Sequence, residues 1–114
     1  MLTLLVALSD GEQHGYALAG RVAELTAQGV RLGPGTLYRT LQRLRVDGLI
    51  VEVGADPDAQ RADRRAERRR RCAITEAGSA AAARELGHLH ALVTSEPARR
   101  LLDHARANRD DDGQ

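Results

Sequence analysis

A short apolar stripe between two runs of turn residues constrains this chain more than any other feature. After residues 33–35 and before residues 47–48, leucine recurs at positions i, i+4 and i+7, at Leu37, Leu41 and Leu44. This spacing places the three side chains on one face of a helix. We therefore predict a helix over about residues 35–47, followed by a strand over about residues 49–53.

The opposite face of this predicted helix carries side chains that bond bases and phosphates. At about 100° per residue, Arg39, Gln42 and Arg43 lie opposite the leucines, and Thr36 and Tyr38 flank them. A helix with leucine inside and Arg, Gln, Thr and Tyr outside suits a DNA major groove. An ordinary amphipathic surface helix would show the same pattern, and the segment alone does not separate the two.

The neighbouring segments follow a definite order. Helices are predicted over about residues 2–9 and 14–28, and a second strand over about residues 69–74. A polar loop, residues 54–68, joins the two strands. Three helices, a strand, a loop and a strand are the order of a winged helix-turn-helix, here predicted over residues 1–74.

Five short segments resemble one family of regulators. They are His14-Gly15-Tyr16, Pro34-Gly35-Thr36-Leu37-Tyr38, Leu41-Gln42-Arg43-Leu44, Asp47-Gly48-Leu49-Ile50 and Ile74-Thr75-Glu76-Ala77-Gly78. In order and spacing they are similar to the PadR family of bacterial transcription regulators, over roughly residues 2–95. The resemblance implies a mainly α fold, with a small two-stranded wing and a C-terminal dimerisation helix. Where relatives carry two adjacent Tyr in the second wing strand, this chain has Arg71 and Cys72.

A block of arginines gives the chain a local positive charge that its net charge of +1 hides. Residues 61–71 hold seven Arg against two acidic residues. A wing at this place would reach phosphates, although a solvated loop would have the same composition. The predicted DNA contacts are Pro34, Gly35, Thr36, Tyr38, Arg39, Gln42, Arg43, Arg64, Arg65, Arg68, Arg69 and Arg70.

The C-terminal region, residues 75–109, is predicted to be helical and to dimerise. Thr75 is placed as an N-cap, and a second helix starts near Pro97. Of the hydrophobic residues 19 are Ala, and Phe and Trp are absent, so one chain buries little area and we expect a second copy to complete the core. Both helices could instead pack back on the same chain. The predicted dimer contacts are Leu4, Leu5, Leu86, Leu89 and Val93.

Other chemistry finds little support in the sequence. His88 and His90 lie about 200° apart on a helix and cannot share a metal, so we expect no metal site and no cofactor. Cys72 is either a small core residue or, beside two arginines, a redox-sensitive thiol. No catalytic motif is present, and we expect no enzymatic activity. Residues 2–8 are too few to span a bilayer, so we expect a cytoplasmic protein with no membrane partner.

The sequence thus predicts a homodimeric DNA-binding regulator that occupies a palindromic operator on double-stranded DNA. As in relatives, we expect a repressor released by a small effector, here an apolar one because Trp and Phe are absent. The alternative from another class is a winged-helix protein-interaction module whose Arg-rich loop binds acidic partners. Nonspecific RNA or DNA binding through the same loop is a further alternative. Residues 110–114 are expected to form a disordered acidic tail.

Overall fold

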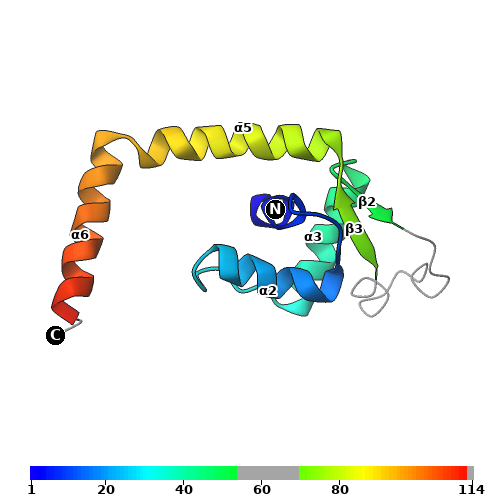
Figure 1. Cartoon of the computed structure of the whole chain (residues 1–114), viewed down its shortest axis with the longest axis horizontal. Helices are drawn as coiled ribbons and strands as arrows, with labels where there is room; N and C mark the ends of the chain where they lie inside the picture. The colour runs from blue at the N-terminus through cyan, green and yellow to red at the C-terminus, as the bar shows by residue number, and fades with distance from the viewer. Residues whose placement is uncertain (54–69, 113–114) are drawn as a thin grey trace. The chain divides into compact units, whose positions relative to one another are not determined.

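The computed structural model describes residues 1–53 and 70–112 of the chain and divides it into two compact units, Met1–Ala82 and Ala83–Gln114. In order, the elements are α1 (Leu2–Leu8), β1 (Gln13–His14), α2 (Gly15–Leu25), α3 (Pro34–Val46), β2 (Ile50–Val53), β3 (Arg71–Ile74), α5 (Glu76–Val93) and α6 (Glu96–Asp112) (Figure 1). The chain is mostly helical with a small antiparallel sheet, as the sequence predicts. None of the described helices is both long and apolar enough to cross a membrane.

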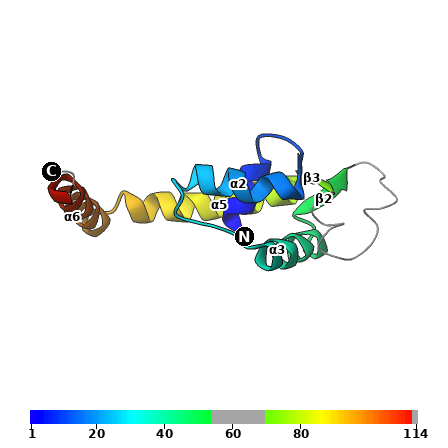
Figure 2. The same cartoon turned by 90° about the horizontal axis from the view of Figure 1, so that it is seen from below.

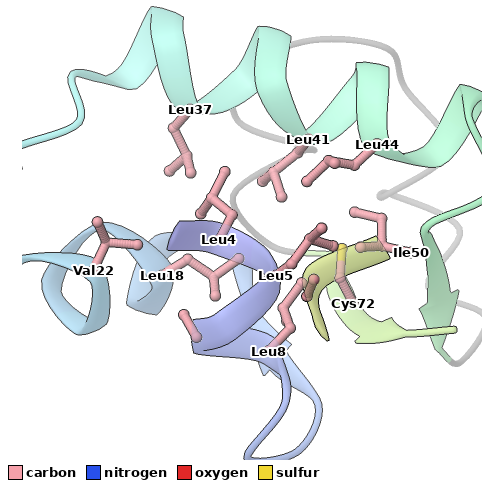
Figure 3. Close-up of a cluster of buried hydrophobic side chains, with 12 residues drawn as sticks. Leu4, Leu5, Leu8, Leu18, Val22, Leu37, Leu41, Leu44, Ile50 and Cys72 are labelled. Atoms are coloured by element: carbon pink, nitrogen blue, oxygen red, sulfur yellow. The ribbon is translucent and has the colours of Figure 1, made fainter. Parts of the chain in front are cut away.

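The core of the first unit lies where α1, α2 and α3 meet. Leu37, Leu41 and Leu44 are exposed by 5%, 0% and 0%, which confirms the apolar stripe. Figure 3 shows these leucines pointing from α3 toward Leu4 on α1. The other members of the buried cluster are Leu5, Ala7, Leu8, Leu18, Val22, Ile50, Cys72 and Ala82. A fully buried Leu contributes about 1.5–3 kcal/mol, so these few large side chains carry most of the stabilisation.

Turn residues define the ends of α3. Pro34 begins the helix, at a position where its missing N–H has no helical partner to lose. At the other end Gly48 adopts φ +75°. The N–H of Gly48 donates to the Arg45 carbonyl at 3.0 Å, and the N–H of Leu49 donates to the Leu44 carbonyl at 2.9 Å. This Schellman motif turns the chain directly into β2.

The sheet has three strands in the order β1-β3-β2, all antiparallel. The predicted wing strands are β2 and β3, with Ile50 opposite Ile74. The third strand, β1, was not predicted, because a two-residue strand leaves no alternating pattern. It is held by pairing of Gln13 with Cys72 and by the Gln13 amide, which donates to the Ala7 carbonyl at 2.7 Å.

Helix α2 ends at Leu25, three residues before the predicted end. The Thr26 hydroxyl accepts a hydrogen bond from the Val30 N–H at 3.0 Å. Ala27 and Gln28 then take φ values of 52° and 67°, a left-handed conformation that a helix cannot contain. The turn that leads from α2 toward α3 is therefore built by local backbone geometry, which apolar periodicity does not reveal.

The start of α5 is tied to the end of α3. The Thr75 hydroxyl accepts the Gly78 N–H at 3.0 Å and donates to the Gly48 carbonyl at 2.7 Å. This confirms Thr75 as the N-terminal cap. A Cβ at Gly78 would overlap the Leu49 carbonyl oxygen and lie 2.8 Å from Ile74 Cγ1. Only glycine lets the first turn of α5 approach this closely.

The second unit consists of the remainder of α5 and of α6. The Ser95 hydroxyl accepts the Ala98 N–H at 3.4 Å, so Ser95 caps α6. The helix continues through Asp112, so residues 110–112 are helical rather than part of a disordered tail. Side-chain pairs one turn apart support it, among them Arg100 with Glu96 at 2.9 Å.

Candidate nucleic-acid interface

The outer surface of α3 carries the predicted DNA-contacting side chains. Figure 2 shows this helix along one side of the first unit. Its leucine face is turned into the core, so the residues opposite reach the surface. Arg39 and Arg43 are exposed, and Gln42 is half-buried. At the start of the helix, Pro34 and Thr36 are exposed and Gly35 is half-buried. The predicted helix contacts therefore lie on one continuous element.

Two of these side chains are linked to each other. The Gln42 amide nitrogen donates to the Tyr38 hydroxyl at 2.9 Å, one turn earlier on the helix. Both side chains are half-buried, which limits the rotamers that they can adopt. This hydrogen bond orients the Gln42 amide, and an oriented amide can pair with the edge of a base.

An open hollow of about 800 Å³ lies along this surface of the helix. It is lined by Met1, Arg39, Thr40, Gln42, Arg43, Val46 and Asp47. Of these residues, Met1, Thr40, Val46 and Asp47 were not among the predicted contacts. Val46 is 82% exposed, a large fraction for an aliphatic side chain. Helical geometry places it about 20° from Arg39, so the sequence already puts Val46 on this face, although an aliphatic side chain bonds neither bases nor phosphates.

The arginines predicted on the second strand and the loop divide into two groups. Arg70 is only 8% exposed, and its guanidinium lies 3.7 Å from the Glu52 carboxylate on β2. Its carbonyl accepts the Gly15 N–H at 3.0 Å. Arg70 therefore belongs to the base of the sheet, which corrects its prediction as a DNA contact. Arg64, Arg65, Arg68 and Arg69 lie outside the described residues.

Arg21 on α2 is engaged within the chain. Its guanidinium donates to Asp10 and, at 3.2 Å, to Glu24. These hydrogen bonds, that of Asp10 first, raise the pKa of Arg21 above its ordinary value. Arg21 is thus held by two carboxylates, whereas Arg43 on α3 contacts one, that of Asp47 at 3.3 Å.

The predicted dimer contacts also fall into two groups, one exposed and one buried. Leu86, Leu89 and Val93 are 45%, 44% and 48% exposed on α5, an aliphatic surface of the kind that a partner covers. Leu4 and Leu5 are instead 1% and 3% exposed. They pack inside their own chain, which corrects the expectation that their side chains meet a partner.

Comparison with known proteins agrees with this architecture. The model of the transcriptional regulator PadR-like family matches residues 4–84. Transcriptional regulator Rv3488 of Mycobacterium tuberculosis is 48% identical over 50 residues, 44% of this chain and 44% of that protein. An uncharacterized 37.1 kDa protein in transposon TN4556 of Streptomyces fradiae is 43% identical over 49 residues, 43% of this chain and 14% of that protein. The matches thus span less than half the length of these relatives.

Solved structures share the fold. A transcriptional regulator from Clostridium thermocellum superposes with a TM-score of 0.63 at 20% identity, over 81% of this chain and 83% of that one. RosR from H. salinarum superposes with a TM-score of 0.59 at 21% identity, over 96% of this chain and 89% of that one. The family match covers most of the chain and confirms the predicted resemblance. The chain therefore belongs to the PadR-like family of transcriptional regulators, which are not enzymes.

Proposed function

We propose that this protein is a sequence-specific DNA-binding regulator that inserts α3 into the major groove. One observation carries the proposal: α3 buries its leucines and exposes Arg39 and Arg43 on the opposite face. The helix itself contains no acidic residue. Arg and Gln are the side chains that pair with the major-groove edges of guanine and adenine.

The proposed DNA-binding form is a homodimer. Leu86, Leu89 and Val93 recur at helical spacing and remain about half exposed in the single chain. Pairing of this surface with the same surface of a second copy would remove it from water. Two copies related by a two-fold axis present two α3 helices in opposite directions. The matching operator is an inverted repeat with half-sites about one helical turn apart.

The direct test is binding of the full chain to DNA. Fluorescence anisotropy with the DNA upstream of its own gene, and selection from random duplexes, should yield an inverted repeat. The selected duplex should bind at least about a thousandfold more tightly than unrelated DNA at the same salt concentration. Equal binding to all duplexes would leave only nonspecific affinity. Binding to acidic polypeptides without any DNA preference would favour the protein-interaction module.

The regulatory mode follows from where the operator lies. We propose repression, in which a dimer bound over a promoter excludes the polymerase. Binding of a small apolar effector then releases the dimer from the DNA. Aliphatic side chains such as Leu86 and Leu89 suit such a ligand better than a flat aromatic one. A reporter fused to the selected operator should fall in expression when the protein is present. A rise in expression would identify an activator instead.

A further inference from the structure

A carboxylate stands at the end of the proposed reading helix. Asp47 is the C-cap of α3, and its Oδ2 lies 3.3 Å from Nε of Arg43 one turn earlier. The two side chains are 40% and 73% exposed, and both line the hollow along the outer surface of α3. The pair therefore lies on the surface that would meet DNA, not behind it.

Helix stability does not account for an acid at this position. The C-terminal end of a helix carries a partial negative charge, which disfavours Asp47 there. An ion pair with the basic residue four positions before the acid is the less favourable order, and exposed pairs contribute little. A carboxylate also repels the phosphates of DNA. Asp47 thus favours neither the helix end nor general DNA affinity, and the side chain that it contacts is Arg43.

The contact leaves a defined part of Arg43 available. Arginine offers five N–H donors in a planar fork. With Nε held by Asp47, the Nη1 and Nη2 groups remain to donate side by side, as the O6 and N7 acceptors of guanine require. The neighbouring negative charge also disfavours a phosphate oxygen at the same guanidinium. We propose that Asp47 is a positioning residue that holds Arg43 as the guanine reader of this protein.

Arg39 provides the contrast. Within residues 1–53 and 70–112 no hydrogen bond or ion pair is found for its side chain. An arginine without an orienting partner suits a phosphate, which accepts donors from many directions. The two arginines of the same face thus have different roles: Arg43 contacts a base, and Arg39 contacts the phosphate backbone of the DNA. This assignment rests on the proposed function and makes it more specific.

The test compares base discrimination, not affinity alone. The selected operator and its single-base variants are titrated with wild type, Asp47→Asn, Arg43→Ala, and the double variant. Asp47→Asn should lower discrimination at one guanine per half-site by about fivefold or more, while affinity for unrelated DNA stays level or rises. Arg43→Ala should lower discrimination at the same base pair. In the Arg43→Ala background, Asp47→Asn should have no further effect on discrimination.

Two further variants complete the design. Arg43→Lys keeps the charge but lacks the rigid planar fork that Asp47 would hold in place, so it should lower the same discrimination with an unchanged salt slope, whether or not Asp47→Asn folds. Asp103→Asn removes the same charge from an Asp that lies 4.0 Å from Arg106 on α6. This control should leave base discrimination unchanged.

The opposing results are distinct. If Asp47→Asn strengthens binding to every duplex equally and discrimination holds, Asp47 only adjusts charge and the inference is wrong. If Arg43→Ala weakens all duplexes alike, Arg43 touches phosphate, and the inference falls while the proposed function stands. A wild-type protein without sequence preference would instead overturn the proposed function itself.

Discussion

At the scale of single residues, Gly78 shows how a short motif is dictated by packing. Its Cα lies against the backbone of Leu49, and a Cβ there would overlap the carbonyl oxygen. Gly78→Ala should destabilise the protein by about 1–3 kcal/mol or more, because backbone cannot move aside as a flexible side chain can. Urea denaturation followed by circular dichroism measures this change.

Gly20 supplies the matched control. It lies within α2, and nothing would contact a Cβ there within 4 Å. Gly20→Ala should therefore stabilise the helix by about 0.5–1 kcal/mol. If both substitutions shifted the urea midpoint in the same direction, the close approach at Gly78 would not be what excludes a side chain.

Cys72 offers a second test at this scale. Its side chain is 0% exposed in the centre of the sheet, as the core interpretation predicts. A thiol reagent should modify the folded protein only as fast as it opens, and should react at once in denaturant. Rapid modification of the native protein, with loss of DNA affinity, would restore the redox interpretation.

The roles of residues were predicted well where local spacing decides them, and poorly where they depend on neighbours that are distant in the sequence. Thr75 caps α5 as its position indicated, and the burial of Cys72 agrees with the core alternative of the two that the sequence left open. Arg70 was assigned to DNA because it continues a run of arginines, but its pairing with Glu52 depends on strand register. Leu4 would be apolar both in the core of one chain and in a dimer interface. Periodicity does not say whether the surface that covers it belongs to the same chain.

At the scale of elements, α1 and α3 were predicted to within one residue at each end. Helix α3 runs over Pro34–Val46 because turn residues stop it at both ends. The short strand β1 was missed, since it depends on a partner distant in sequence. The end of α2 was placed too late because two residues with positive φ end it. The local sequence reveals a boundary only where a particular residue type, such as Pro or Gly, determines the backbone conformation.

The segment between β2 and β3 gives the prediction at this scale. Arg64, Arg65 and Arg68 should meet phosphates rather than read bases. Each neutralised phosphate contributes about 0.9 to the slope of log K against log salt. Replacing all three by Ala in both subunits should lower that slope by up to about five units, with the preferred operator unchanged. Titrations at several salt concentrations measure the slope.

The opposite result would be equally clear. If operator preference disappeared while the slope held, these arginines would read a narrow minor groove. The division of labour between this segment and α3 would then be wrong.

At the scale of the whole molecule, the aliphatic surface of α5 remains to be covered. If Leu86 packs against a partner, Leu86→Asp places an unpaired carboxylate in the interface, which costs several kcal/mol. The dimer dissociation constant should rise about a hundredfold or more, and operator affinity should fall with it because one α3 contacts only a half-site. Sedimentation velocity across a concentration series measures the first effect.

Leu25→Asp is the control, since Leu25 on α2 is 43% exposed against 45% for Leu86. This substitution should leave the dimer intact. A wild-type chain that sediments as a monomer at micromolar concentration would refute the dimer, and α5 would need another partner.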